Sequence, residues 1–122
     1  MKKARILIVE DDALIAVAIS RMLTKFGYEP LSPVERGEDV LESVKANAPD
    51  LILMDIRLGG VIDGIDAINE VRKQFDTPFV YMTGNSDEKT YKRAIATNPA
   101  GYISKPFVME ECREVISRAL SA

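Results

Sequence analysis

The stretch LILMDIRLGG, residues 51–60, decides the fold class. Four apolar residues lead into Asp55, and the chain then runs toward two glycines. A continuous apolar run of this length is typical of a strand in a parallel sheet, where both faces are buried. Asp55 therefore stands at the carboxyl end of a buried strand, where the chain leaves the core. It is either the cap of a turn or a reactive group held at the edge of the sheet.

The same pattern is repeated along the whole chain, because short apolar runs alternate with stretches of helical periodicity. We expect strands in 5–10, 28–34, 51–55, 77–84 and 101–107, and helices in 13–27, 37–50, 63–76, 86–98 and 109–122. In the first helical stretch, the apolar residues at helical spacing are Leu14, Ile15, Ala18, Ile19, Met22 and Phe26. Such alternation predicts an α/β fold with a doubly wound parallel sheet and helices on both faces. Five strands suit the flavodoxin-like order 2-1-3-4-5.

Composition narrows the function classes. The 122 residues indicate one domain, which we expect to span 1–122. A net charge of -3 gives no reason to expect nucleic acid or a membrane surface as a partner. The chain has no histidine, which excludes Ser-His-Asp catalysis and histidine-ligated zinc. Cys112 is the one cysteine, so no internal disulfide forms, and we expect a cytoplasmic protein.

Polar residues are placed where the predicted strands end. Glu10 and Asp11 follow the first strand, Asp55 ends the third, Thr83 ends the fourth and Lys105 follows the fifth. In the expected strand order, ligands bind at the carboxyl ends of strands one and three, so these five residues should converge. Singly, each has a simpler explanation, since aspartates after strands commonly cap turns or helices and lysines are mostly solvated.

The combination points to a metal. At 4 Å and an effective dielectric constant near 20, each pair of carboxylates repels by roughly 4 kcal/mol, which capping does not offset. A divalent cation does, and Mg²⁺ takes one or two carboxylates together with phosphate oxygens. This favours Asp11 and Asp55 as direct ligands, with Glu10 acting through water. A carboxylate beside Mg²⁺ can also accept a phosphoryl group, to whose oxygens Lys105 and Thr83 can donate.

Four motifs carry a family resemblance: ILIVEDD (6–12), LILMDIRL (51–58), YMTG (81–84) and SKPF (104–107). In this order and spacing, the chain resembles a response-regulator receiver domain of the CheY-like superfamily, in its single-domain form. The resemblance covers essentially the whole chain. Receivers of this superfamily have the 2-1-3-4-5 order, so the resemblance and the expected strand order are not independent.

The resemblance implies a role for each clustered residue. Asp55 resembles the phospho-acceptor, and Glu10 and Asp11 resemble the acidic pair that holds Mg²⁺. Thr83 resembles the hydroxyl that responds to phosphorylation, and Lys105 resembles the lysine that pairs with the phosphoryl group.

Further positions follow from the same resemblance. The backbone carbonyl of Arg57 would be another metal ligand, and Tyr102 resembles the switch aromatic whose rotamer follows activation. Arg57 and Asn85 stand at positions that tune phosphoryl hydrolysis in this family. The Lys105–Pro106 bond should be cis. Asp12 matches no family position, and we expect it to cap the first helix. The loop IRLGGVIDG (56–64) has glycines where many receivers have proline and is one residue longer.

The function implied is that of a phosphorylation-dependent receiver in a two-component system or phosphorelay. Asp55 would accept its phosphoryl group from a phosphohistidine on a histidine kinase or phosphotransfer protein, and the switch would alter a surface for an unknown downstream protein. We expect no enzymatic activity beyond phosphorylation and dephosphorylation of its own aspartate.

Other functions stay open at this point. One is a degenerate receiver that binds partners without phosphorylation. Another is an aspartyl-nucleophile phosphatase, but such enzymes usually carry a second Asp at the position of Arg57. A flavin carrier would need a phosphate-cradling loop after the first strand, where this chain has EDDA (10–13).

Overall fold

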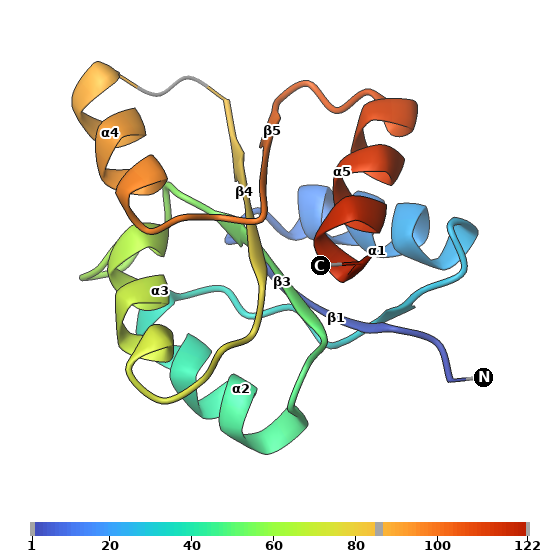
Figure 1. The fold of residues 1–122 in the computed structure, drawn as a ribbon, viewed down its shortest axis with the longest axis horizontal. Coiled ribbons are helices and arrows are strands. Elements are labelled where there is room, and N and C mark those ends of the chain that lie inside the picture. The colour runs from blue at the N-terminus through green and yellow to red at the C-terminus, as the bar shows by residue number, and fades with distance from the viewer. Residues whose placement is uncertain (1, 85–86, 122) are drawn as a thin grey trace.

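The computed structural model describes residues 2–84 and 87–121, in which strands and helices alternate (Figure 1). The strands are β1 (Arg5–Val9), β2 (Glu29–Pro30), β3 (Leu51–Asp55), β4 (Phe79–Thr83) and β5 (Gly101–Ser104). The helices are α1 (Ala13–Lys25), α2 (Val40–Asn47), α3 (Gly64–Arg72), α4 (Glu88–Ala96) and α5 (Met109–Ser121). A short 3₁₀-helix, Gly37–Asp39, precedes α2. Every segment predicted from periodicity contains the expected element.

The described strands form one parallel sheet in the order β2-β1-β3-β4-β5, which confirms the predicted topology. In the register of the sheet, Asp55 pairs with Met82, and Thr83 pairs with Ser104. The carboxyl ends of β1, β3, β4 and β5 therefore lie at one edge. The two-residue β2 is at the border of the sheet, as its prolines predicted.

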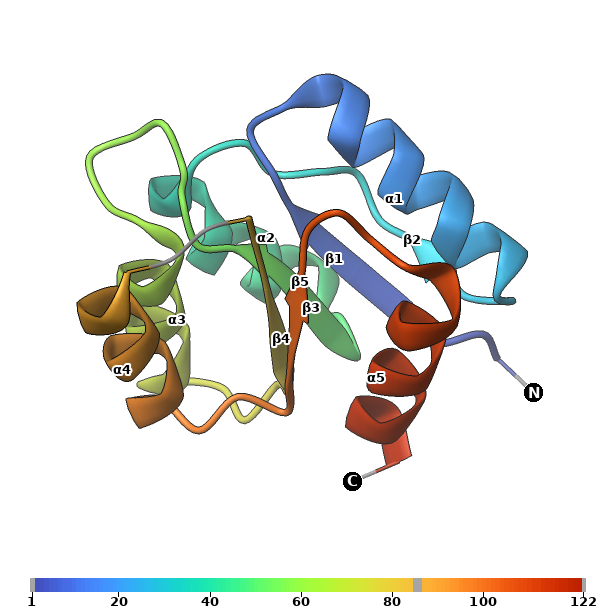
Figure 2. The same cartoon turned by 90° about the horizontal axis from the view of Figure 1, so that it is seen from above.

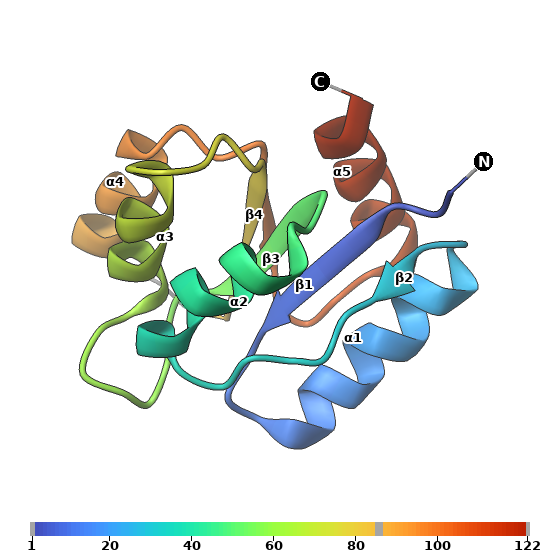
Figure 3. The same ribbon diagram turned by 90° about the horizontal axis from the view of Figure 1, so that it is seen from below.

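Helices cover both faces of this sheet, as predicted for a doubly wound fold. Figures 2 and 3 show α1 and α5 on one side and α2, α3 and α4 on the other. The buried core divides in the same way, and β3 contributes to both halves. Its Leu51 and Leu53 pack toward α1 and α5, whereas Ile52 and Met54 pack toward α2 and α3. A strand with this double burial needs the continuous apolar run that the sequence has.

Local chemistry sets the ends of the helices. The carboxylate of Asp12 accepts hydrogen bonds from the amides of Leu14 and Ile15, which confirms Asp12 as the N-cap of α1. Gly27 has φ of 95° just after α1, a left-handed conformation that glycine adopts without strain. Asp87 caps α4 by accepting from the amide of Thr90. Within the described ranges, no helix combines the length and apolar character needed to cross a membrane.

The buried face of α1 is shifted from the one that the pattern suggested. Leu14 is 83% exposed and Ala18 is also exposed, whereas Ala16, Ile19 and Leu23 are buried. The first turn of α1 directly follows the carboxyl end of β1, so Leu14 projects beyond the sheet and has no strand to cover.

Candidate functional site

Three carboxylates meet at the carboxyl edge of the sheet. Glu10 and Asp11 follow β1, and Asp55 ends the neighbouring β3. One oxygen atom from each lies within 4.8 Å of the other two. Glu10 and Asp55 are buried, whereas Asp11 is exposed to solvent. The convergence that strand order predicted is therefore present, with two of the acids inside the protein and one at its surface.

Lys105 supplies the positive charge next to this cluster. Its Nζ lies 3.2 Å from Oε1 of Glu10 and 3.6 Å from Oδ2 of Asp55. The Lys105 amide also donates a 2.7 Å hydrogen bond to the carbonyl of Thr83, which places the lysine beside the end of β4. The Lys105–Pro106 peptide bond is cis, as the resemblance implied. One lysine thus partly neutralises two buried carboxylates.

Burial raises the pKa of Glu10 from its usual 4.5 to about 7, and a hydrogen bond with Asp55 acts in the same direction. The amide of Asp12 and the ammonium of Lys105 act the opposite way, but they are weaker. Near neutral pH and without a metal, a large share of Glu10 therefore keeps its proton. A bound cation would favour the ionised form instead.

The donor set fits a magnesium ion. All three clustered acids offer oxygen atoms, which hard cations prefer, and the exposed position of Asp11 leaves room for the waters that Mg²⁺ retains. The nearby Thr83 hydroxyl is buried, and its Oγ1 has no hydrogen-bond partner within the part of the chain that the structure describes. Buried hydroxyls are normally paired, so the Thr83 hydroxyl is a candidate donor to a group bound at this site.

The loop after β3 packs closely around the cluster. The amide of Arg57 donates a 3.1 Å hydrogen bond to Oδ1 of Asp55. A Cβ at Gly59 would lie 3.3 Å from Oδ2 of Asp11, and a Cβ at Gly60 would lie 2.5 Å from Oε1 of Glu38. The glycines therefore allow the loop to pass between two acidic side chains, and Glu38 is a neighbour that no sequence motif indicated.

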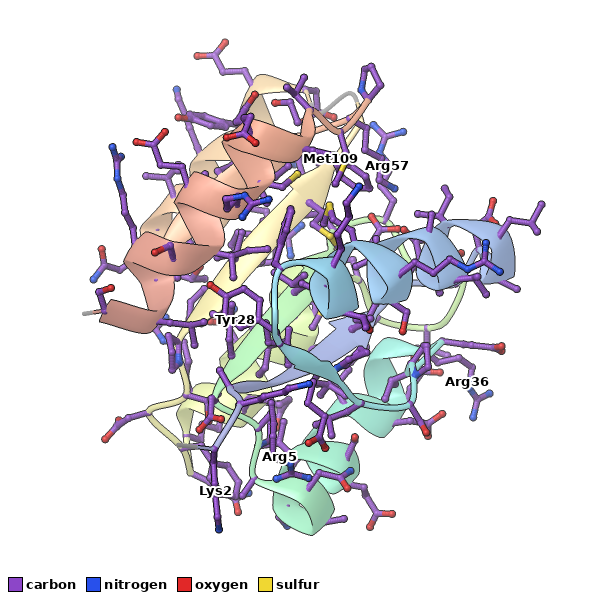
Figure 4. All side chains as sticks on the ribbon, turned by 90° about the vertical axis from the view of Figure 1, so that its right-hand side faces the viewer. Lys2, Arg5, Tyr28, Arg36, Arg57 and Met109 are labelled. Carbon is purple, nitrogen blue, oxygen red and sulfur yellow. The ribbon has the colours of Figure 1, made fainter. Side chains whose placement is uncertain are left out.

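Two further residues, Arg57 on this loop and Asn85 after β4, were predicted to act at the site. The Arg57 side chain is exposed, and Figure 4 shows it at the end of the molecule opposite Lys2 and Arg5. Its role as a carbonyl ligand stays a prediction. Asn85 lies outside the described residues.

Tyr102, on β5, lies between two other tyrosines. Its ring meets that of Tyr81 at a centroid distance of 6.4 Å and that of Tyr91 at 5.4 Å, both edge to face. Tyr81 is fully buried and Tyr91 is half exposed on α4, so Tyr102 joins the core to the surface of α4. This placement is compatible with the switch role, which stays a prediction.

Comparisons with known proteins agree with this arrangement. The profile of the response regulator receiver domain matches residues 6–117. The transcriptional regulatory protein PdtaR of Mycobacterium tuberculosis is 33% identical over 117 residues, which cover 96% of this chain and 57% of PdtaR. Chemotaxis protein CheY of Bacillus subtilis is 33% identical, with 96% of this chain and 98% of CheY covered.

Solved structures show the same fold. The BeF3-activated N-terminal receiver domain of Klebsiella pneumoniae RstA aligns with a TM-score of 0.88 at 25% identity, and the alignment covers 97% of this chain and 99% of that domain. The chain spans about half the length of the first curated relatives that it matches, 57% of PdtaR and 45% of YvrH of Bacillus subtilis. The chain therefore belongs to the response regulator receiver domain family, whose members work in two-component signalling.

Proposed function

We propose that this chain is a receiver whose Asp55 accepts a phosphoryl group in a Mg²⁺-dependent reaction. The observation that carries the proposal is the meeting of Glu10, Asp11 and Asp55 beside Lys105. The hydroxyl of Thr83, which has no hydrogen-bond partner among the described residues, lies at the end of the neighbouring strand. We take the receiver domain to span 1–122. Members of the family act as signalling domains rather than as enzymes on external substrates, and self-phosphorylation and self-dephosphorylation would be the chemistry of this chain.

The donor is a phosphohistidine on a partner histidine kinase or phosphotransfer protein. A carboxylate oxygen of Asp55 attacks phosphorus while the bond from phosphorus to the partner's imidazole nitrogen breaks. The imidazole leaves with the electron pair and takes up a proton, and an aspartyl phosphate remains. A Mg²⁺ held by Asp11, Asp55 and the Arg57 carbonyl, with Glu10 reached through water, would neutralise the charge on the phosphoryl oxygens.

Lys105 and Thr83 respond to the new charge. The ammonium of Lys105 exchanges its contact with Glu10 for a phosphoryl oxygen, to which it can donate a charge-assisted hydrogen bond. The hydroxyl of Thr83 gains the acceptor that it lacks within the described residues. Its movement leaves space that Tyr102 fills, so the surface of α4, β5 and α5 changes for a downstream protein. Arg57 and Asn85 would set how long the phosphoryl group persists.

A surface beside the site supports docking of the phosphoryl donor. The apolar side chains of Leu14 and Val17 are 83% and 48% exposed on α1, next to Asp11. A groove of about 420 Å³ follows the same helix, lined by Ala16, Val17, Ser20, Arg21, Thr24 and Pro33. An apolar patch of this kind, with no acidic residue in α1, favours a helical partner that brings its histidine over Asp55. We place these events in the cytoplasm, where the free thiol of Cys112 is stable.

The direct test is incubation with acetyl phosphate and Mg²⁺, followed by intact-mass measurement. We expect a gain of one phosphoryl group, which Asp55→Asn and chelation by EDTA both abolish. Asp12→Asn is the matched control, because it removes a neighbouring carboxylate while an asparagine still caps α1. An adduct on another residue, or equal labelling of the Asp55→Asn protein, would refute the assignment.

A further inference from the structure

Few side chains of helix α4 are buried against the rest of the domain. Of its nine residues, all of them described, only Ala94 is buried. Its Tyr91 touches Tyr102 edge to face, and Thr97, just beyond its end, shares a buried hydrogen bond with Tyr81. Elements with few buried apolar side chains are those that open or shift at low free energy. The contacts that remain therefore have a large influence on where α4 lies.

One of those contacts is a forked ion pair from Arg93, which we call the Arg93 clasp. Nη1 of Arg93 lies 2.8 Å from Oδ2 of Asp63, and Nη2 lies 3.1 Å from Oδ1 of Asp66. Arg93 is on α4, whereas Asp63 is the N-cap of α3 and Asp66 is in its first turn. Helix α3 runs beside α4 in Figures 1 and 3. The clasp thus joins the two neighbouring helices through both arms of one guanidinium.

The aspartates are themselves held in place. Asp63 accepts from the amide of Asp66, while the Asp66 carboxylate accepts from the amide of Asp63, which makes a reciprocal capping box. Although partial burial acts to raise the pKa of Asp63, the hydrogen bonds from Arg93 and from the Asp66 amide lower it overall. Asp63 is therefore ionised at neutral pH and available to the guanidinium.

This turn of α3 is attached directly to the phospho-acceptor strand. The amide of Gly64 donates a 2.8 Å hydrogen bond to the carbonyl of Ile56, the residue after Asp55. Gly64 also lies so close to the carbonyl of Asp55 that a Cβ there would overlap it. A chain of contacts therefore runs from Asp55 through the start of α3 to Arg93 on α4, and it does not pass through Thr83 or Tyr102.

We propose that Arg93 is a positioning residue, and that the Arg93 clasp holds α4 in the arrangement of the unphosphorylated domain and opens when the domain is activated. The inference rests on the proposed function, because it supplies a second route from Asp55 to α4. One end of the clasp is fixed by the capping box and the other is on a lightly held helix. A shift of α4 with Tyr91 and Tyr102 therefore has to break the two hydrogen bonds that Arg93 donates to Asp63 and Asp66.

The strength of the clasp suits a switch. The Arg93 side chain is 41% exposed, so solvent weakens the ion pair, and it biases the equilibrium rather than locking it. The planar guanidinium binds two carboxylates at once and so fixes the position of α4 relative to α3. A lysine ammonium at this place would fix that position less well. Removal of the clasp should change the ratio of the two arrangements about five-fold.

The test uses the whole chain, Mg²⁺ and beryllium trifluoride as the probe, followed by nuclear magnetic resonance of backbone amides. We expect Arg93→Gln to bind beryllium trifluoride about five-fold more tightly than the wild type. In the probe-free variant, the α4 amide signals should already move toward their probe-bound positions. Asp66→Asn should act in the same way from the other side, and the double variant should exceed neither single one by much.

Lys92→Gln is the matched control. It removes the same charge from the same helix, but the Lys92 side chain is 73% exposed and pairs with Glu88 within α4 itself. We expect it to leave probe affinity and α4 signals unchanged. If Arg93→Gln keeps wild-type affinity and wild-type α4 signals, or if Lys92→Gln has an equal effect, the inference fails while the proposed function stands. If the wild type itself binds no beryllium trifluoride, the proposed function is refuted, and the switching role of the clasp is refuted as well.

Discussion

Lys105 is paired with Glu10 more closely than with Asp55. The ammonium is 3.2 Å from the Glu10 carboxylate and 3.6 Å from that of Asp55. The Lys105 ammonium therefore offsets part of the negative charge of the acidic cluster. If a cation bound there neutralised that charge, the same side chain could turn toward a phosphoryl oxygen on Asp55.

The first prediction concerns competition between Lys105 and Mg²⁺. The ammonium repels a divalent cation bound a few ångströms away, by about 2 kcal/mol at 4 Å even at the dielectric constant of water. Lys105→Met should therefore tighten Mg²⁺ binding by roughly ten-fold or more. Isothermal titration calorimetry measures this directly. Lys25→Met, on the far end of α1, is the control and should leave the affinity unaltered. Unchanged or weaker binding by Lys105→Met would show that the lysine does not face the cation.

The second prediction is a pH dependence that comes from Glu10. Its pKa is about 7 in the folded domain and about 4.5 when unfolded, so between these values the folded state binds more protons. In EDTA, ionising Glu10 should therefore lower the free energy of unfolding as pH rises from 4.5 to 7, by on the order of 3 kcal/mol. Below pH 4.5 this loss is absent, and above pH 7 it is complete.

Urea unfolding of the wild type and of Glu10→Gln at each pH isolates this contribution. The glutamine cannot ionise, so the difference between the two proteins should change across this window and be flat outside it. Mg²⁺ competes with the proton, so Mg²⁺ affinity of the wild type should rise over the same pH range. A difference between the two proteins that does not vary with pH would mean that folding leaves the pKa of Glu10 unshifted.

The sequence predicts the site well because the site is made by strand ends. Residues at the carboxyl ends of parallel strands share one edge whatever the loops do, so the strand pattern alone groups Asp11, Asp55 and Lys105. The pattern is less informative about helix faces. The exposure of Leu14 depends on how far α1 extends past the sheet, which periodicity does not report.

Contacts between helices were not predictable at all. Arg93 meets Asp63 across thirty positions of sequence, and both residues look like ordinary solvated charges until α3 and α4 are placed side by side. The approach of Glu38 to Gly60 is similar, because it depends on the path of a loop whose glycines only indicated freedom. Such contacts arise from tertiary placement, which no local propensity specifies.

The third prediction tests the buried hydrogen bond between Tyr81 and Thr97, whose oxygens are 2.7 Å apart. Burial raises the pKa of Tyr81 to about 12, so its hydroxyl stays protonated and can donate. Tyr81→Phe should destabilise the domain by about 1 kcal/mol, since Thr97 keeps its own bond to the Ala94 carbonyl. Thermal unfolding followed by circular dichroism gives the value. Tyr91→Phe, on the exposed side of α4, should change stability by less than about 0.5 kcal/mol.

The last prediction concerns the glycine that joins α3 to the phospho-acceptor. A Cβ at Gly64 would overlap the Asp55 carbonyl and approach Met54 to 2.9 Å, and both are parts of buried β3 that cannot yield easily. Gly64→Ala should therefore destabilise the domain by about 1–3 kcal/mol through overpacking, and it should also slow phosphorylation by acetyl phosphate, because Asp55 is displaced. Gly84→Ala is the matched control, since a Cβ there meets no atom of residues 2–84 and 87–121 within 4 Å. The control should be neutral in urea unfolding and in the rate of phosphoryl gain.

Equal effects of the two substitutions would show that loss of glycine, and not the contact with Asp55, is responsible. A Gly64→Ala protein of normal stability and normal phosphorylation rate would mean that α3 can withdraw from the acceptor strand, which would also remove the first step of the path to Arg93.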